Sequence, residues 1–218
     1  MGHSKASKAS THARLVETAA AKFKERGIDG ISLSDLMKDL KLTHGGFYRH
    51  FDSRDELVAE ALDLALRQTG RTLRERLFDG DKADFSAFLD FYLSEEHREA
   101  RAEGCAVAAL AGDAPRKGAA VQAKFREEIE NSLQILSEVL RQGGSAASAR
   151  ASALLVLSAL YGALIMARAV GDSSLSRETL QTVRNQLLNL SGPAKKKPRP
   201  RRSKRRKPKP LAEAGELR

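Results

Sequence analysis

Apolar residues recur along most of this chain at the three- and four-residue spacing of an amphipathic helix. Leu15, Ala19 and Phe23 show the pattern early in the sequence, and Ile129 and Leu133 repeat it much later. We find no alternating apolar run flanked by hairpin turns, which is the pattern of a half-buried strand. The chain is therefore expected to be all-α, with about nine helices and no internal repeat.

The composition fits a folded chain of one or two domains. Its 218 residues are 41% hydrophobic and 30% charged, which is enough to bury a core. The single cysteine, Cys105, excludes an intrachain disulfide and a zinc site built on several cysteines. The opening Met-Gly-His-Ser-Lys-Ala lacks an apolar signal core, so we expect a cytoplasmic protein. No catalytic motif is present, and we expect no enzyme activity, no cofactor and no metal.

The positive charge is concentrated at the C-terminal end. Residues 191–218 contain 12 Lys/Arg and 2 Asp/Glu, whereas residues 1–190 contain 26 of each sign. Within that body, residues 1–54 hold 10 basic and 6 acidic residues, and residues 55–190 hold 16 and 20. A basic head and tail on a neutral body favour a nucleic-acid partner. The tail is expected to be disordered, because its like charges repel and its prolines break helices.

The segment 32–51 has the spacing of a helix-turn-helix. Ser32 and Asp35 predict a capping box that opens a short helix, and Thr43 is expected to cap a second helix after a tight turn. The second helix of such a pair sits in the DNA major groove. Two glycines follow the Thr43 cap, where the free N–H groups of a helix start suit phosphate and where glycine allows close backbone approach.

This segment also carries a family resemblance. It resembles the DNA-reading helix of TetR/AcrR-family repressors through one continuous stretch, Thr43-His44-Gly45-Gly46-Phe47-Tyr48-Arg49-His50-Phe51-Asp52-Ser53-Arg54-Asp55-Glu56-Leu57. The resemblance covers residues 10–65 and includes the two preceding helices. It implies a homodimer that binds a palindromic double-stranded DNA operator and is released by a small-molecule effector.

The resemblance and the side-chain chemistry together select the expected DNA-contact residues: Ser32, Leu33, Ser34, Thr43, His44, Gly45, Gly46, Tyr48, Arg49, His50 and Arg54. Tyr48, His50 and Arg54 match phosphate-contacting positions of the family. Gly46 stands where many members carry Thr or Ser, which leaves His44 as the best candidate for a direct base contact. Taken alone, both histidines would be ordinary surface residues.

These observations divide the chain into four expected segments: a flexible N-terminus at 1–9, a helix-turn-helix domain at 10–55, a regulatory and dimerisation domain at 56–190, and the basic tail at 191–218. The apolar stretch between Arg150 and Arg168 is at the lower limit of length for a membrane span. A helix that is apolar all round needs cover on every side, so we expect it to form a homodimer interface with the last helix and expect no membrane partner.

An effector pocket is expected within the regulatory domain, lined by residues of several apolar helices: Phe88, Phe91, Tyr92, Cys105, Leu110, Phe125, Leu133 and Tyr161. Any of these can also be plain core. Two interpretations of Cys105 are open. A thiolate is favoured at a helix start, which suits the sensing of an electrophile, whereas free cysteines are usually small buried hydrophobes.

Two functions are therefore compatible with the sequence. One is a homodimeric, ligand-responsive transcriptional regulator, with repression the family norm. The other is a non-specific architectural DNA-binding protein dominated by its basic tail. A regulator binds its own site roughly 10³–10⁷ times more tightly than random DNA, so specificity separates the two.

Overall fold

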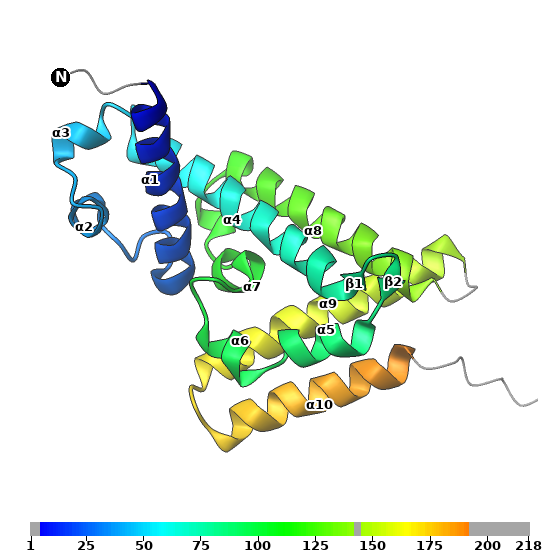
Figure 1. Cartoon of the computed structure of the whole chain (residues 1–218). Coiled ribbons are helices and arrows are strands. Elements are labelled where there is room, and N and C mark those ends of the chain that lie inside the picture. The colour runs from blue at the N-terminus through cyan, green and yellow to red at the C-terminus, as the bar shows by residue number, and fades with distance from the viewer. Residues whose placement is uncertain (1–4, 142–144, 192–218) are drawn as a thin grey trace, which may run out of the picture.

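Ten α-helices and a short β-hairpin make up most of the residues that the computed structural model describes, 5–141 and 145–191 (Figure 1). The expected all-α class is confirmed. The helices are α1 (Lys5–Arg26), α2 (Leu33–Asp39), α3 (His44–Phe47), α4 (Arg54–Leu77), α5 (Phe85–Tyr92), α6 (Glu95–Glu99), α7 (Ala106–Leu110), α8 (Ala119–Leu140), α9 (Ala146–Ala169) and α10 (Ser174–Ser191). β1 (Phe78–Asp79) pairs antiparallel with β2 (Lys82–Ala83), and a 3₁₀ turn spans Ala114–Arg116. The expected basic tail lies outside the described residues from Gly192 onward.

Side-chain caps begin the three helices that follow α1. In each, a hydroxyl oxygen accepts a hydrogen bond of 3.1–3.2 Å from the N–H three residues later, as the sequence predicted for Ser32, Thr43 and Ser53. The reciprocal bond of the first capping box has a different donor. In a capping box the Asp35 carboxylate would accept from the backbone N–H of Ser32. Here the carboxylate accepts from the Ser32 hydroxyl, at 2.7 Å, and the same hydroxyl accepts from the Asp35 N–H.

α1 begins earlier than the sequence predicted. The folded part was expected from residue 10 onward, but the helix starts at Lys5, and Thr11 lies inside it and donates to the Ser7 carbonyl at 3.0 Å. Residues 5–9, which were expected to be flexible, are thus part of the helix. The helix ends at Arg26, where Gly27 adopts a φ of +82° that favours glycine.

α4 is the central element of the fold. It packs against α1 on one side and against α8, α5 and α7 on the other, while α9 packs against α8 and α10. Figure 1 shows α2 and α3 on the side of α1 that faces away from α8 and α9. One buried cluster runs from Phe23 in α1 through Leu62 in α4 to Leu160 in α9. The expected domain boundary after residue 55 falls in the first turn of α4, so this helix belongs to both halves.

α9 is the apolar helix that the sequence singled out. Among the described residues it is the one helix long and apolar enough to cross a membrane by length and composition alone, a test that the core helix of a soluble protein also passes. Ala153, Leu160 and Leu164 are buried against the rest of the chain. Leu155 and Met166, in contrast, are each 56% exposed, so one face of α9 lacks cover.

Candidate nucleic-acid interface and ligand pocket

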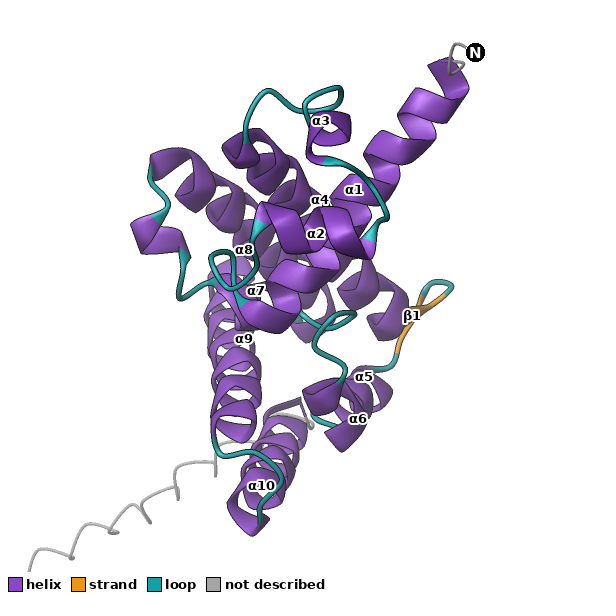
Figure 2. Ribbon diagram, turned by 90° about the vertical axis from the view of Figure 1, so that its left-hand side faces the viewer, coloured by secondary structure: helices purple, strands orange, loops and turns teal. Residues whose placement is uncertain are grey.

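α2 and α3 form a helix-turn-helix that is anchored from one side only. Phe47 and Phe51 are buried, and their rings stack at 5.5 Å between centroids. This anchoring directs the opposite side of α3 outward, where His44 is exposed and Tyr48 is 60% exposed. Figure 2 shows α3 at the periphery of the molecule, beside the N-terminal part of α1.

The two glycines of α3 are not required by the fold. A Cβ added at Gly45 would meet nothing within 4 Å, and one added at Gly46 would lie 3.5 Å from Thr43 Oγ1, an ordinary contact. Neither has the positive φ that favours glycine. Glycine lowers helix stability by about 1 kcal/mol relative to alanine. The free space at Gly45 therefore suits close approach by a partner outside the protein.

A cationic groove of about 400 Å³ lies between the first turns of α1 and α3. Its walls include Lys8 and Thr11 from α1, and Gly46, Arg49 and His50 from the α3 region. Sequence reasoning missed Lys8 and Thr11 because it placed them in or beside a flexible start. The available signal was the unbroken run of helix-compatible residues before Leu15, which can extend a helix that packing has already nucleated.

His50 lines this groove, and one of its ring nitrogens has no hydrogen-bond partner. Its Nδ1 is buried and has no hydrogen-bond partner. Burial lowers the pKa of His50, and the nearby His12, Lys8 and Arg49 lower it further. His12 stacks on Phe51 at 4.5 Å, and its Nε2 lies 2.8 Å from the Glu60 carboxylate.

The expected contacts from α2 and α4 have different surroundings. Ser32 and Ser34 are exposed, and the Ser34 hydroxyl lies 3.5 Å from His44 Nε2. Leu33 is half-buried and packs on the core. The Arg54 guanidinium is directed inward, where it donates to the carbonyls of Ile28 at 2.5 Å and Ile31 at 3.2 Å. Arg54 thus braces the loop between α1 and α2.

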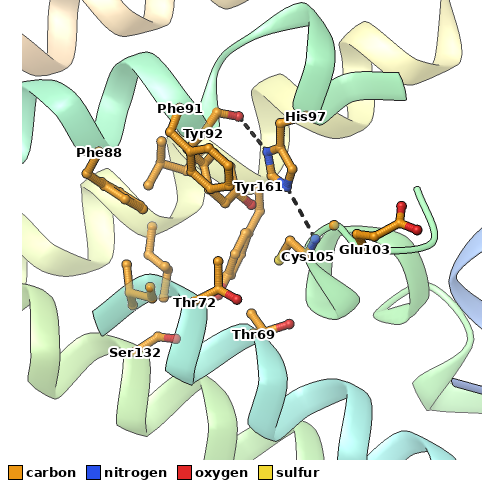
Figure 3. Close-up of a pocket in the computed structure, with 14 residues that line it drawn as sticks. Thr69, Thr72, Phe88, Phe91, Tyr92, His97, Glu103, Cys105, Ser132 and Tyr161 are labelled. Atoms are coloured by element: carbon orange, nitrogen blue, oxygen red, sulfur yellow. Dashed lines mark hydrogen bonds between the residues drawn. The ribbon is translucent and has the colours of Figure 1, made fainter. Parts of the chain in front are cut away.

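A small cavity lies between α4, α5, α8 and α9 (Figure 3). Its free volume is about 40 Å³, far below the roughly 300–1,000 Å³ of a typical ligand pocket. Five of the expected pocket residues line it: Phe88, Phe91, Tyr92, Cys105 and Tyr161. The other three do not. Leu110 and Leu133 belong to the core, and Phe125 lines a separate open groove, because their helices turn these side chains away from the cavity.

Several polar residues of the cavity wall were not predicted from the sequence: Thr69, Thr72, His97, Glu103 and Ser132. The threonines lie on the inner face of α4, and Ser132 lies on the inner face of α8. A polar residue on the apolar face of a helix was the signal that could have identified them. Most residues on such a face are ordinary core, however, so the pattern alone does not distinguish a pocket.

His97 connects α5 to the start of α7 through both ring nitrogens. Nδ1 donates to the Tyr92 carbonyl at 2.7 Å, and Nε2 accepts from the Cys105 N–H at 3.4 Å (Figure 3). These partners define one neutral tautomer. Burial lowers the pKa of His97, against a smaller opposing effect of the bond to the Tyr92 carbonyl. The ring also lies against Phe91, at 5.3 Å between centroids.

Cys105 caps α7 but is not poised as a thiolate. Its Sγ accepts from the Ala108 N–H at 3.5 Å, which confirms the expected helix start. The side chain is only 5% exposed, and burial raises the pKa of the thiol. Of the two interpretations of Cys105, burial favours the small buried hydrophobe, because the loss of hydration outweighs the stabilisation of an anion by so short a helix.

Two cations, the half-buried Arg168 and the buried Lys24, lie near this end of the cavity. Arg168 of α9 donates to the carbonyls of His97 and Arg98, each at 3.0 Å. Lys24 of α1 is buried within electrostatic range of Glu103 and Cys105, and burial lowers its pKa. Lys24 thus places α1 within electrostatic range of this end of the cavity. No group of three or more metal-ligating side chains occurs in the described part of the chain.

A helix-turn-helix with an outward polar face, attached to a helical body with an internal cavity, defines a DNA-binding transcriptional regulator. The chain belongs to the TetR family. Residues 15–61 match the family model for bacterial regulatory proteins of the tetR family. Residues 82–186 match the model for the C-terminal domain of LmrA/YxaF-like transcriptional regulators.

Individual relatives agree with this assignment. The uncharacterized HTH-type transcriptional regulator Rv0196 of Mycobacterium tuberculosis is 27% identical over 184 residues, which cover 81% of this chain and 92% of that protein. YvdT of Bacillus subtilis, also an uncharacterized HTH-type transcriptional regulator, is 29% identical over 92 residues, 39% of this chain and 46% of its own length.

Solved structures share the whole fold. A TetR transcriptional regulator from Chloroflexus aurantiacus superposes with a TM-score of 0.70 at 25% identity, covering 84% of this chain and 94% of that one. The reduced form of Escherichia coli NemR gives 0.67 at 20% identity, covering 83% and 96%. The N-terminal helix-turn-helix and the helical C-terminal part are thus one known architecture.

Proposed function

We propose that this protein is a cytoplasmic, homodimeric transcriptional repressor that binds a palindromic operator and is released by a small-molecule effector. The observation that carries the proposal is the free space at Gly45, on a helix whose aromatic anchors direct it outward. Nothing within the described residues requires glycine there, whereas close approach to a DNA groove does.

The proposed DNA surface combines the tip of α3 with the groove beside it. Thr43, His44, Gly45 and Gly46 face the bases and backbone. Phosphates are contacted by Tyr48, Arg49 and His50 and, from α2, by Ser32 and Ser34. Leu33 packs on the core and so holds α2 in position. Lys8 of α1 joins this set because it faces Arg49 across the cationic groove. Arg54 acts through the α1–α2 loop that it braces.

The proposed dimer interface is the uncovered face of α9, with α10 beside it. Its exposed apolar residues recur at helical spacing: Leu154, Leu155, Ile165 and Met166. Exposed apolar side chains gathered on one helix face favour association. A two-fold axis through this face relates two copies of α3, which a palindrome requires roughly 34–36 Å apart.

The effector is proposed to act through α7. Cys105 at its start lines the cavity, and α7 packs against α1, α4 and α9. Beyond its end, Lys117 pairs with Asp29 in the α1–α2 loop at 2.6 Å. Because the cavity is smaller than a ligand, binding must displace its walls. A displacement of α7 shifts α1 and the loop, and so changes the population of dimers that fit the operator.

The basic tail adds a sequence-independent contribution in this proposal. Residues 195–209 contain 11 Lys/Arg in 15 positions. Each phosphate that they neutralise steepens the salt dependence of binding without selecting a sequence. Removal of residues 192–218 should therefore weaken binding to any duplex and flatten its salt dependence.

The test is selection of bound sequences from a pool of random 30-base-pair duplexes by the full-length protein. The proposal predicts an inverted repeat, bound by two copies of the chain. Leu155→Glu, which places a charge in the proposed dimer interface, should give monomers that no longer enrich the repeat, whereas Gln134→Glu on the exposed face of α8 should behave as wild type. A pool that stays random would instead support the architectural function.

A further inference from the structure

One buried hydroxyl in the wall of the cavity lacks a strong hydrogen-bond partner. The Tyr92 hydroxyl and His50 Nδ1 are the two buried side-chain atoms of the described residues without a hydrogen bond of good geometry. Tyr92 is only 7% exposed and lines the cavity, and the group that its hydroxyl faces is the Cys105 thiol, a weak partner. A buried hydroxyl held only by a thiol lowers stability, so a ligand that offers it a stronger acceptor gains free energy.

Three other polar groups of the wall are already occupied. The Thr69 hydroxyl donates to the Ala65 carbonyl at 3.2 Å and accepts from the Ala106 N–H at 2.9 Å. The Ser132 hydroxyl donates to Glu128 Oε1 at 2.8 Å. His97 uses both ring nitrogens, as described above. The Tyr92 hydroxyl is therefore a buried donor that a ligand can use, whereas Thr69, Ser132 and His97 offer no vacant buried acceptor.

Charge at the cavity disfavours an ionic ligand of either sign. Glu103 is the charged side chain of the lining, and its carboxylate repels an anion. Arg168 and Lys24 lie within electrostatic range of Cys105 at the same end and repel a cation, but neither lines the cavity, so neither gives an anion a direct contact. An ion without an opposite charge in contact loses its hydration uncompensated. The remaining wall is apolar and rich in aromatic rings, including Phe88 and Phe91.

We propose that this cavity binds an uncharged aromatic molecule that carries a carbonyl oxygen, and that the Tyr92 hydroxyl donates a hydrogen bond to that oxygen. The inference rests on the proposed function, since it names the chemistry of the effector. Phe91 is the wall residue that moves to admit the ring. It is half-buried, and its outer face carries the Arg76 guanidinium 4.3 Å from the ring centroid, whereas Phe88 is fully buried.

The test uses three probes with the same ring: acetophenone, ethylbenzene, which lacks the acceptor, and benzoate, which is an anion. Binding to the full-length protein is measured by ligand-observed NMR. Acetophenone should bind most tightly of the three. Tyr92→Phe should weaken acetophenone about two- to tenfold, the effect of one hydrogen bond, and leave ethylbenzene unchanged. Tyr161→Phe, in the same wall, is the matched control and should change neither.

Three results would overturn the inference: tighter binding of benzoate than of acetophenone, an equal effect of Tyr92→Phe on acetophenone and ethylbenzene, or no binding of any probe. The ranking of probes on the unaltered protein decides the question even if Tyr92→Phe does not fold. Operator selection is measured separately. A protein that binds acetophenone but selects no DNA sequence would contradict the proposed function and leave the pocket chemistry standing.

Discussion

The backbone N–H of Ile28 donates a hydrogen bond of 3.3 Å to the carboxylate of Asp113, 85 positions further along the chain. The bond joins the loop after α1 to the segment after α7. Asp113 also pairs with Arg116 at 2.6 Å, and the neighbouring Lys117 pairs with Asp29 at 2.6 Å. The loop between α1 and α2, which leads into the helix-turn-helix, is thus bonded directly to residues 113–117, which follow α7.

Asp113→Ala should weaken this joint. The Ile28 N–H loses its acceptor, which should lower the free energy of unfolding by about 1–2 kcal/mol. Urea unfolding gives the stability, and amide hydrogen exchange at Ile28 should become faster. Asp81→Ala, an exposed aspartate in the β-turn, should stay within about 0.5 kcal/mol of wild type. Equal stability of the two variants would contradict a structural role for the joint.

Gly45→Ala should separate folding from DNA binding. The added methyl group meets nothing within 4 Å inside the protein, so the fold should be kept or stabilised by up to about 1 kcal/mol. Affinity for the selected duplex should fall at least about tenfold, because the methyl group occupies the space that DNA needs. Gly112→Ala is the control, since Gly112 is also exposed with nothing within 4 Å. Equal affinities of the two variants would count against the α3 surface.

Lys8→Ala should change the salt dependence of DNA binding. If Lys8 neutralises one phosphate beside Arg49, the slope of log Kobs against log[salt] should become shallower by about 0.9 per binding site. Fluorescence anisotropy at several salt concentrations measures this slope. Arg14→Ala removes an exposed charge from another face of α1 and should leave it unchanged. An unaltered slope in Lys8→Ala would remove α1 from the DNA interface.

The sequence allowed the helix-turn-helix to be predicted because its boundaries depend on local chemistry. Ser32, Thr43 and Ser53 cap their helices through bonds that span three residues, and Gly27 ends α1 through its own φ. The inward direction of Arg54 could not be predicted in this way, because its carbonyl partners belong to a loop more than 20 positions earlier.

The pocket was predicted only in part for the same reason. Aromatic residues of α5 and Tyr161 were recognisable as candidates, but the sequence does not say which side of a packed helix faces a cavity. Leu133 and Ser132 are adjacent on α8, yet Ser132 lines the cavity and Leu133 belongs to the core. The Cys105 pKa likewise depends on tertiary burial, which reverses the effect expected from its helix start.

Glu128→Gln should make the protein more stable at alkaline pH. Burial raises the pKa of Glu128 above its ordinary 4.5, against the smaller effect of its bonds from Ser132 and Asn131. Between 4.5 and the raised value the folded state holds more protons than the unfolded chain, so stability falls as the pH rises through this window. The variant should therefore be more stable than wild type at pH 8.

The advantage of Glu128→Gln should vanish near pH 4, where both states of the wild type are protonated. Thermal unfolding between pH 4 and pH 8 measures the difference in stability between the variant and the wild type. Glu75→Gln, at an exposed position of α4, should show no such trend. A variant that is less stable than wild type at every pH would mean that the carboxylate is needed for its hydrogen bonds rather than tolerated.

Cys105 should react slowly with iodoacetamide in the native protein. Its burial and raised pKa predict a rate more than about tenfold below that of the urea-unfolded chain. The rate follows from mass spectrometry of the alkylated protein, with Cys105→Ser as the blank. Rapid native alkylation that also releases DNA, and that Cys105→Ser abolishes, would support electrophile sensing in place of the reversible ligand proposed above.

The most direct test of the central claim is the ratio of two dissociation constants, for the selected inverted repeat and for the same bases in scrambled order, at one salt concentration. We predict a ratio of roughly 10³ or more, with two chains bound per repeat. A ratio near one would contradict a sequence-reading regulator and leave only a protein that coats DNA by charge.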